Sequence, residues 1–145
     1  MSTANAWAAG FFDGEGCVSI ASGKQSGYGG VYYRVDLIVS NTDQRPLRVF
    51  KRLFGGRIDR RVREGNRRVA YQWRTTGSAH AAAVLHELEA WLVVKNEQAG
   101  VALMACSLLT MRGGKRSAAE VAQLRDLKEQ MHALNRRGKP VCQVS

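Results

Sequence analysis

The sequence predicts an α+β fold in which helices cover one face of an antiparallel sheet. Three observations support this prediction. Two pairs of strand-like segments each surround a loop that contains glycine, which is typical of hairpins. Helix-like segments with capping residues precede, separate and follow these pairs. The longest strand-like segment alternates apolar and polar residues, so one face of the sheet should be buried and the other polar.

The length and charge of the chain limit the possible classes of protein. We expect one domain over residues 1–145, with a core over about residues 5–110 and a helical extension over about residues 117–137. The 22 Lys and Arg residues exceed the 12 Asp and Glu residues, which gives a net charge of +10. This excess indicates a polyanionic partner, with nucleic acid as the default and solubilising charge as the alternative.

The first half of the core is predicted from caps and alternation. A helix over residues 5–16 starts at Asn5 as its N-cap and ends on glycines. A short strand over residues 17–21 leads into a glycine-rich loop over residues 22–30. In the strand over residues 31–40, the odd-numbered positions are expected to face the core.

The second half repeats this order and then continues in helices. Cap-type residues before position 44 start a helix over residues 44–54, with Pro46 tolerated in its first turn. Strands over residues 57–63 and 67–75 enclose a turn at residues 64–66. Helices over residues 78–94, with Ser78 as cap, and residues 97–111 follow. Ser117 and Glu120 form a capping box for the last helix.

Cysteine usage and hydropathy exclude several classes. The three cysteines are an odd number without CxxC spacing, which argues against a disulfide framework or a zinc site and fits a reducing compartment. No run of 18 apolar residues is present, so we expect no membrane partner. The six residues before the first ordered segment leave no room for a signal peptide. We therefore expect an intracellular protein, cytoplasmic in a bacterial or phage-like setting or organelle-encoded, and not secreted.

The polar face of the sheet is rich in arginine. Seven arginines and no lysines lie between residues 57 and 74. Guanidinium groups match phosphates and guanine edges, and glutamine can pair with adenine. A solvated polar face is the alternative, but solubility alone does not require guanidinium geometry. The predicted DNA-binding residues on this face and its loop are Lys24, Gln25, Tyr28, Tyr32, Arg34, Asp36, Ile38, Arg57, Asp59, Arg61, Arg63, Arg68, Gln72 and Arg74.

The first helix carries small residues on one side and acids at its end. Ala6, Ala9, Gly10 and Asp13 fall at i, i+3, i+4 and i+7, which would let a second helix approach closely. Asp13 and Glu15 lie at the helix C-terminus, where the helix dipole disfavours each by roughly 0.3–1 kcal/mol. A divalent cation would use this charge. A simple helix end before a turn is the equally weighted alternative.

Residues 8–16, AAGFFDGEG, resemble the LAGLIDADG motif of homing endonucleases. Ala8 replaces the usual leucine, and Glu15 takes the place of the last aspartate. Residues 54–58 and 92–99 also resemble family segments, so the resemblance covers about residues 5–110. It implies an αββαββα core with a saddle-shaped antiparallel sheet followed by C-terminal helices.

The resemblance also implies a function. The protein would be a site-specific endonuclease that hydrolyses double-stranded DNA at a long pseudo-palindromic site, acting as a homodimer with Mg2+ or, in its place, Mn2+, and without a small-molecule cofactor. Ala6, Ala9, Gly10 and Asp13 would form the dimer interface, although Asp13 in the family more often supports the helix ends.

The same resemblance assigns catalytic roles. Glu15 would hold the metal, with the backbone of Gly14 beside it. Lys95, Asn41 and Arg45 would line a pocket that positions water and stabilises charge.

Two other classes of function stay open. One is a non-catalytic nucleic-acid-binding module on the same fold, such as an intron maturase or a transcription regulator. The other is a basic structural protein that dimerises through the small-residue helix. Glu15 and Lys95 favour the enzyme over the module, and the arginine pattern argues against the structural protein.

Overall fold

The computed structural model describes residues 2–24, 31–62, 65, 68–110 and 116–137. Its elements confirm the predicted order of a helix, two strands, a helix, two strands and further helices. The predicted contacts Gln25, Tyr28 and Arg63 lie outside the described residues. The elements are α1 (Thr3–Glu15), β1 (Gly16–Lys24), β2 (Val31–Asn41), α2 (Gln44–Phe54), β3 (Arg57–Val62), β4 (Val69–Arg74), α3 (Ser78–Leu88), the 3-10 turn η1 (Glu89–Trp91), α4 (Asn96–Thr110) and α5 (Ala118–Arg136).

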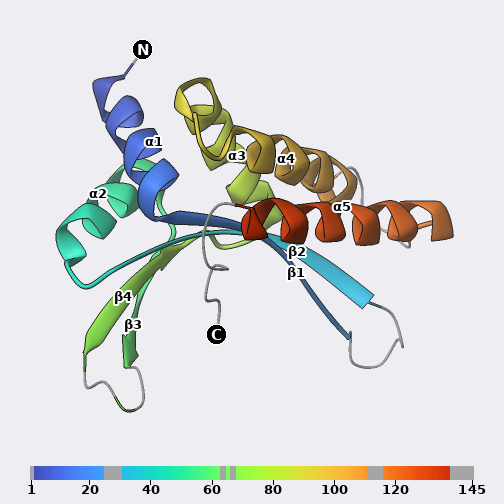
Figure 1. The fold of residues 1–145 in the computed structure, drawn as a ribbon, viewed down its shortest axis with the longest axis horizontal. Helices are drawn as coiled ribbons and strands as arrows, with labels where there is room; N and C mark the ends of the chain where they lie inside the picture. Colours follow the sequence, from blue (N-terminus) through green and yellow to red (C-terminus); the bar gives the residue numbers. More distant parts are fainter. Residues whose placement is uncertain (1, 25–30, 63–64, 66–67, 111–115, 138–145) are drawn as a thin grey trace.

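The four strands form one antiparallel sheet in the order β1-β2-β4-β3. All the helices lie on one side of this sheet, and the β1–β2 and β3–β4 hairpins bend away from them like two arms (Figure 1). The opposite side of the sheet is therefore concave, which confirms the predicted saddle.

The strand register confirms which residues share a face. Val18 pairs with Leu37, and Val39 pairs with Trp73, and all four side chains belong to the buried core beneath the helices. Ile38, one position along, is only 3% exposed but is not part of that core. The alternation predicted for β2 therefore holds, with the odd-numbered positions 33 to 39 on the helix side.

The start of the chain differs from the prediction in two respects. Ser2, not Asn5, is the N-cap of α1, and its Oγ accepts a hydrogen bond from the backbone N–H of Asn5 at 3.4 Å. The side chain of Asn5 instead donates to the carboxylate of Glu87 in α3 at 2.8 Å. Strand β1 also continues to Lys24, because residues as far as Lys24 pair with β2.

Helix α3 is shorter than predicted and starts differently. It ends at Leu88 rather than near residue 94. Gly77 occupies the cap position without a side-chain bond, while Ser78 Oγ accepts from the backbone N–H of Val35 at 3.1 Å. This bond ties the start of α3 to the middle of β2. The residues after η1 leave the helix because they bond to α1, as described below.

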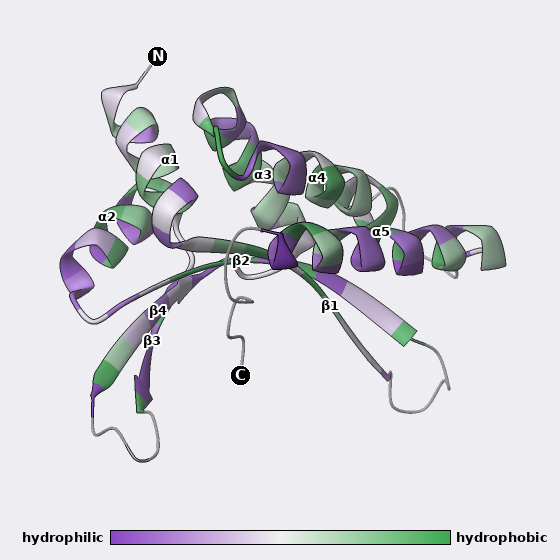
Figure 2. Ribbon diagram, in the orientation of Figure 1, coloured by the Kyte–Doolittle hydropathy of each residue, from purple (hydrophilic) through white to green (hydrophobic). Residues whose placement is uncertain are grey.

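Helix α5 confirms the predicted capping box of Ser117 and Glu120. Leu124, Leu127 and Met131 form its buried stripe. Hydrophobic and hydrophilic segments alternate along the ribbon of α5 (Figure 2). The side-chain amide of Asn135 donates to the backbone carbonyl of Val18 at 3.0 Å. Helix α5 therefore supplies a hydrogen-bond donor to one backbone acceptor of edge strand β1. None of the helices in the described part of the chain is long and apolar enough to cross a bilayer.

The described cysteines differ in state. Cys106 is a free thiol in the core, and burial raises its pKa to about 11. Cys17 on β1 is disulfide-bonded. The expectation against disulfides, which came from the odd cysteine count and the spacing, is therefore wrong for Cys17.

Gly56, the residue before β3, has a backbone conformation in which a larger residue should destabilise the fold. Its φ of 87° is unfavourable for other residues, and a Cβ there would lie 2.6 Å from the backbone oxygen of Arg74. Gly65 has a similar φ of 82° but open space around it. We expect Gly56→Ala to lower the free energy of unfolding by about 3 kcal/mol, and Gly65→Ala by about 1 kcal/mol. Urea denaturation of both variants measures the difference; equal losses would contradict the close approach.

Candidate active site and nucleic-acid interface

Helix α1 ends where the sheet begins, and glycine is required at that junction. The backbone N–H of Gly16 closes the last turn on the carbonyl of Phe12. A Cβ at Gly16 would lie 2.4 Å from the Phe12 ring, so a larger residue cannot occupy this position without moving the core. The preceding residue, Glu15, is exposed, and its carboxylate forms no hydrogen bond or ion pair with any residue that the structure describes.

Asp13 fastens the segment after η1 to this helix end. Its carboxylate accepts hydrogen bonds from the backbone N–H groups of Val93, Val94 and Lys95 at 2.8, 3.1 and 3.0 Å. The ammonium group of Lys95 in turn donates to the backbone carbonyl of Asp13 at 2.7 Å, and Lys95 is only 9% exposed. Lys95 is therefore held at the same end of α1 as Glu15, 80 positions away in sequence.

Replacement of Asp13 tests this arrangement. In Asp13→Ala the three backbone donors lose their acceptor, and we expect the free energy of unfolding to fall by about 2 kcal/mol. In Asp13→Asn one oxygen remains, so we expect about half that loss. Urea denaturation measures the stability of both variants. An alanine variant as stable as the unmodified chain would show that the hydrogen bonds to Asp13 contribute nothing to stability.

The metal-ligating groups of one chain do not form a complete site. Within the described ranges, no group of three His, Cys, Asp or Glu residues is placed to hold a metal ion. Mg2+ is commonly bound by one or two carboxylates together with substrate phosphates and water. The exposed carboxylate of Glu15 fits such a shared site and does not fit a cation cage built from a single chain.

Asn41 and Arg45 lie in the turn that starts α2. The side-chain oxygen of Asn41 accepts from the backbone N–H of Asp43 at 2.8 Å. Asp43 caps α2 and forms an ion pair with Arg45 at 2.6 Å, and these hydrogen bonds lower the pKa of Asp43 to about 2. Asn41 lies two residues beyond Val39, the pairing partner of Gly16. The structure records no bond from Asn41 or Arg45 to Glu15 or Lys95, so their predicted catalytic roles stay predictions.

The outward face of α1 is rotated by about one residue from the predicted face. Ala9 is fully buried within the chain, so its assignment to the dimer interface is wrong. Asp13 uses its carboxylate inside the chain, and Ala6 is half-buried. Ala8, Ala9 and Phe12 form the buried side because they pack into the core.

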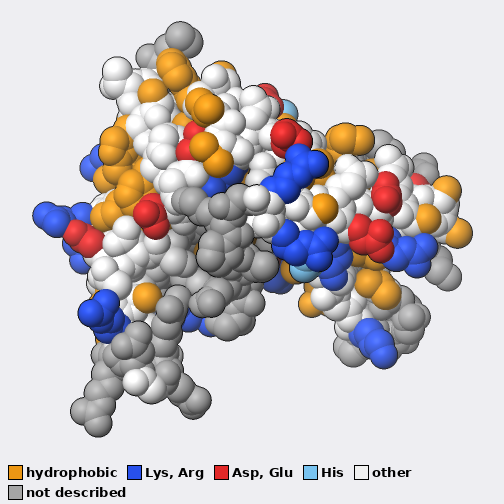
Figure 3. Space-filling model, in the orientation of Figure 1, with side chains coloured by type: hydrophobic (Ala, Val, Ile, Leu, Met, Phe, Trp, Pro, Cys, Tyr) orange, Lys and Arg blue, Asp and Glu red, His pale blue; other side chains and the backbone are white. Residues whose placement is uncertain are grey.

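Before Glu15, the exposed residues of α1 are Thr3, Trp7, Gly10 and Gly14, which are spaced by four, three and four positions. A Cβ at Gly10 or Gly14 would meet no atom within 4 Å. Trp7 is 44% exposed and stacks on Phe11, with the ring centroids 5.3 Å apart. Hydrophobic side chains gather on this side of the molecule (Figure 3). The sequence signal for this face is an aromatic residue, Trp7, three positions before Gly10 and so on the same side of the helix.

On the concave face, two arginines lie beside the carboxylate of Asp36. Asp36 accepts from Arg34 Nε at 3.0 Å and lies 3.8 Å from Arg74 Nη2. The hydrogen bond and charge of Asp36 raise the pKa of Arg34. Asp36 and Ile38 are each 3% exposed and Gln72 is 8% exposed. The expectation that these three face solvent is therefore wrong. For Asp36 the covering side chains are those of Arg34 and Arg74.

Several other residues predicted to bind DNA are exposed on this face. Tyr32 is 43% exposed, and Arg57 and Arg68 are also exposed. Arg57 forms an ion pair with Asp59 at 3.2 Å. The Nε of Arg61 is buried and has no hydrogen-bond partner within the part of the chain described. Lys24 differs, because the alternation of β1 places it on the face of Val18 rather than on the polar face.

The fold and this junction define an α+β protein whose arched sheet carries arginines on its concave side and a carboxylate where a helix enters the sheet. Comparison with protein families identifies the class: the model of the LAGLIDADG endonuclease family matches residues 8–95, and the chain belongs to this family. The resemblance drawn from the motif is thereby confirmed. A search of the curated proteins finds no match.

Solved structures share the fold. The homing endonuclease I-CvuI in complex with its target superposes with a TM-score of 0.77 at 21% identity, over 95% of this chain and 85% of that one. The archaeal intron-encoded homing endonuclease I-Vdi141I, complexed with DNA, gives a TM-score of 0.78 at 18% identity, over 93% of this chain and 86% of that one. I-TnaI gives 0.73 at 16% identity, over 92% and 97% of the two chains.

Proposed function

We propose that this protein is a homing endonuclease that hydrolyses both strands of DNA at a long pseudo-palindromic site, acting as a homodimer with Mg2+. The proposal rests above all on the exposed carboxylate of Glu15, which has no partner among the described residues and lies at the junction of α1 and the concave sheet, with Lys95 held at the same helix end. As an enzyme that acts on cellular DNA, it would work inside the cell, and the family resemblance suggests an intron-associated gene.

The concave face supports duplex DNA as the substrate. Its arginines present forked donors that suit phosphates and guanine, and the orphaned Nε of Arg61 is a donor that a DNA acceptor would satisfy. Asp36 holds Arg34 and Arg74 in place, so we assign it a positioning role rather than base contact. Similar proteins were solved as DNA complexes, in one case with Mg2+ and in another with Ca2+.

The incomplete metal site supports the dimer. One chain offers one exposed carboxylate at α1, and a pair of strand cleavages requires two sites. Gly10 and Gly14 leave the outer side of α1 open for a second helix backbone. A two-fold axis beside these glycines would bring the two Glu15 side chains together and would make the target pseudo-palindromic.

The chemistry follows from the groups at this helix end. Bound Mg2+ supplies polarisation of the scissile phosphate and a lower pKa for an attacking water. Glu15 binds and orients the cation. The ammonium of Lys95, fixed by the Asp13 carbonyl, supplies positive charge for the developing negative charge on phosphate. Asn41 and Arg45 would orient water at the edge of this site.

Cleavage of a randomised-site plasmid library tests the proposal. The protein is incubated with the library and Mg2+, and the cut ends are sequenced. We expect the cut sites to share a long consensus whose two halves are related by approximate two-fold symmetry. Selective binding of sites without cleavage, with either Mg2+ or Mn2+, would instead identify a non-catalytic binding module on the same fold.

A further inference from the structure

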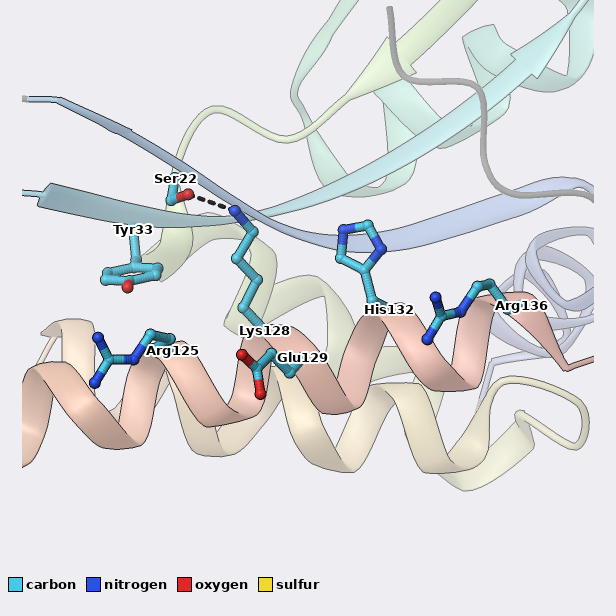
Figure 4. A pocket seen from close by; sticks show the side chains of 7 residues that line it. All are labelled: Ser22, Tyr33, Arg125, Lys128, Glu129, His132 and Arg136. Atoms are coloured by element: carbon cyan, nitrogen blue, oxygen red, sulfur yellow. Dashed lines mark hydrogen bonds between the residues drawn. The ribbon is translucent and has the colours of Figure 1, made fainter.

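A concave site away from the saddle lies between α5 and the β1–β2 arm. It has a volume of about 460 Å³ and is lined by cationic residues of α5 together with Ser22 of β1 and Tyr33 of β2. In Figure 4, Arg125 points toward Tyr33 and Lys128 reaches across to Ser22. The site lies at the edge of the sheet on its helix side, because β1 is an edge strand and Ser22 and Tyr33 share the face of Val18 and Leu37.

The cations of this site form a row on one side of α5. Arg125, Lys128, His132 and Arg136 are spaced by three, four and four residues, so they fall on one helix face. They span eleven residues, or about 16 Å at the helical rise. Figure 3 shows Lys and Arg side chains along the lower edge of α5 with an acidic side chain among them. Such a row suits an extended polyanion better than one compact anion.

No ion pair among the described residues neutralises the charge of this row. Glu129 is the one acid lining the site. None of Arg125, Lys128 and Arg136 forms an ion pair with an acidic residue of the described segments. His132 adds positive charge when it is protonated. The row therefore keeps an excess of positive charge beside a concavity with two hydroxyl groups, which is an anion-binding arrangement.

We propose that the α5 groove, formed by Arg125, Lys128, His132 and Arg136 with Ser22 and Tyr33, binds backbone phosphates of duplex DNA beyond the segment under the sheet. The inference rests on the proposed function, since DNA must first occupy the saddle. The contact carries no base specificity, because only phosphates are bound. It adds affinity and salt dependence to binding that the sheet directs.

A pair of charge-removing variants tests this groove. The probe is a fluorescein-labelled 40-bp duplex of random sequence, and affinity is measured by anisotropy between about 50 and 200 mM NaCl. For Arg125→Gln/Arg136→Gln we expect roughly a 10-fold loss of affinity and a salt slope shallower by about 1.8, the value for two phosphate contacts. The control is Lys51→Gln/Arg52→Gln, which removes two charges from exposed residues at the end of α2. We expect the control to change affinity less than about 2-fold.

Four outcomes would overturn the inference. Equal effects of the α5 pair and the α2 pair would mean that only overall charge matters. An α5 pair that binds the duplex like the unmodified chain, while Arg57→Gln/Arg61→Gln loses binding, would remove the α5 contact and leave the proposed function intact. Absence of duplex binding by the unmodified chain would reject both. Stabilisation by pyrophosphate that the α5 pair loses, without any change in duplex affinity, would assign the groove to a free phosphate compound instead.

Discussion

Glu15→Gln is expected to abolish DNA cleavage while leaving DNA binding within about 3-fold of the unmodified chain. The glutamine keeps the size and the exposed position of the side chain but removes the negative charge that would hold a divalent cation. Loss of the cation removes both phosphate polarisation and water activation, so we expect a rate at least ~10³-fold lower. The measurement is single-turnover cleavage of a site recovered from the library, with affinity measured in Ca2+.

The matched control is Glu89→Gln. Glu89 is exposed, and its ion pair is with His86 at 3.3 Å and does not involve Glu15. We expect cleavage by this variant at the unmodified rate. Cleavage by Glu15→Gln at a comparable rate would remove Glu15 from the mechanism, whatever the binding measurements show.

Gly10→Leu is expected to convert the protein from a dimer into a folded monomer without cleavage activity. A Cβ at Gly10 meets nothing within 4 Å in a single chain, so the leucine fits the folded monomer. Leucine also has a higher helix propensity than glycine, by about 0.8 kcal/mol. Two facing leucine side chains would, however, hold the two α1 backbones apart and separate the two Glu15 carboxylates.

The control substitution for Gly10 is Gly100→Leu in α4. Gly100 is likewise helical, exposed and without an atom within 4 Å of a built Cβ. Sedimentation velocity at low salt gives the oligomeric state, and circular dichroism gives the helix content. We expect Gly100→Leu to stay dimeric and active. A dimeric, active Gly10→Leu variant would contradict the packing of α1 helices across the two-fold axis.

Local signals in the sequence were sufficient for much of the fold. The capping box at Ser117 and Glu120 and the alternation of β2 depend on neighbouring residues, and both are confirmed. The early end of α3 depends on hydrogen bonds from Val93, Val94 and Lys95 to Asp13, some 80 positions away. Periodicity does not contain that information.

The errors in the site have a similar origin. Small residues occur on two sides of α1, and only tertiary packing shows that Ala9 faces the core while Gly10 faces outward. Asp36 is closed off because the register of β2 and β4 brings Arg74 beside it. The resemblance assigned Lys95 to a pocket with Asn41 and Arg45, and it did not predict the hydrogen bonds with Asp13 that hold Lys95 at the end of α1.

The position of Mn2+ in a crystal of the protein with its recovered DNA site tests the central claim most directly. Anomalous scattering locates the metal independently of how the side chains are built. We expect Mn2+ in contact with the Glu15 carboxylate of each of two subunits, between closely packed α1 helices and beside a DNA phosphate. Metal bound elsewhere, or two α1 helices that lie apart in the complex, would contradict the account.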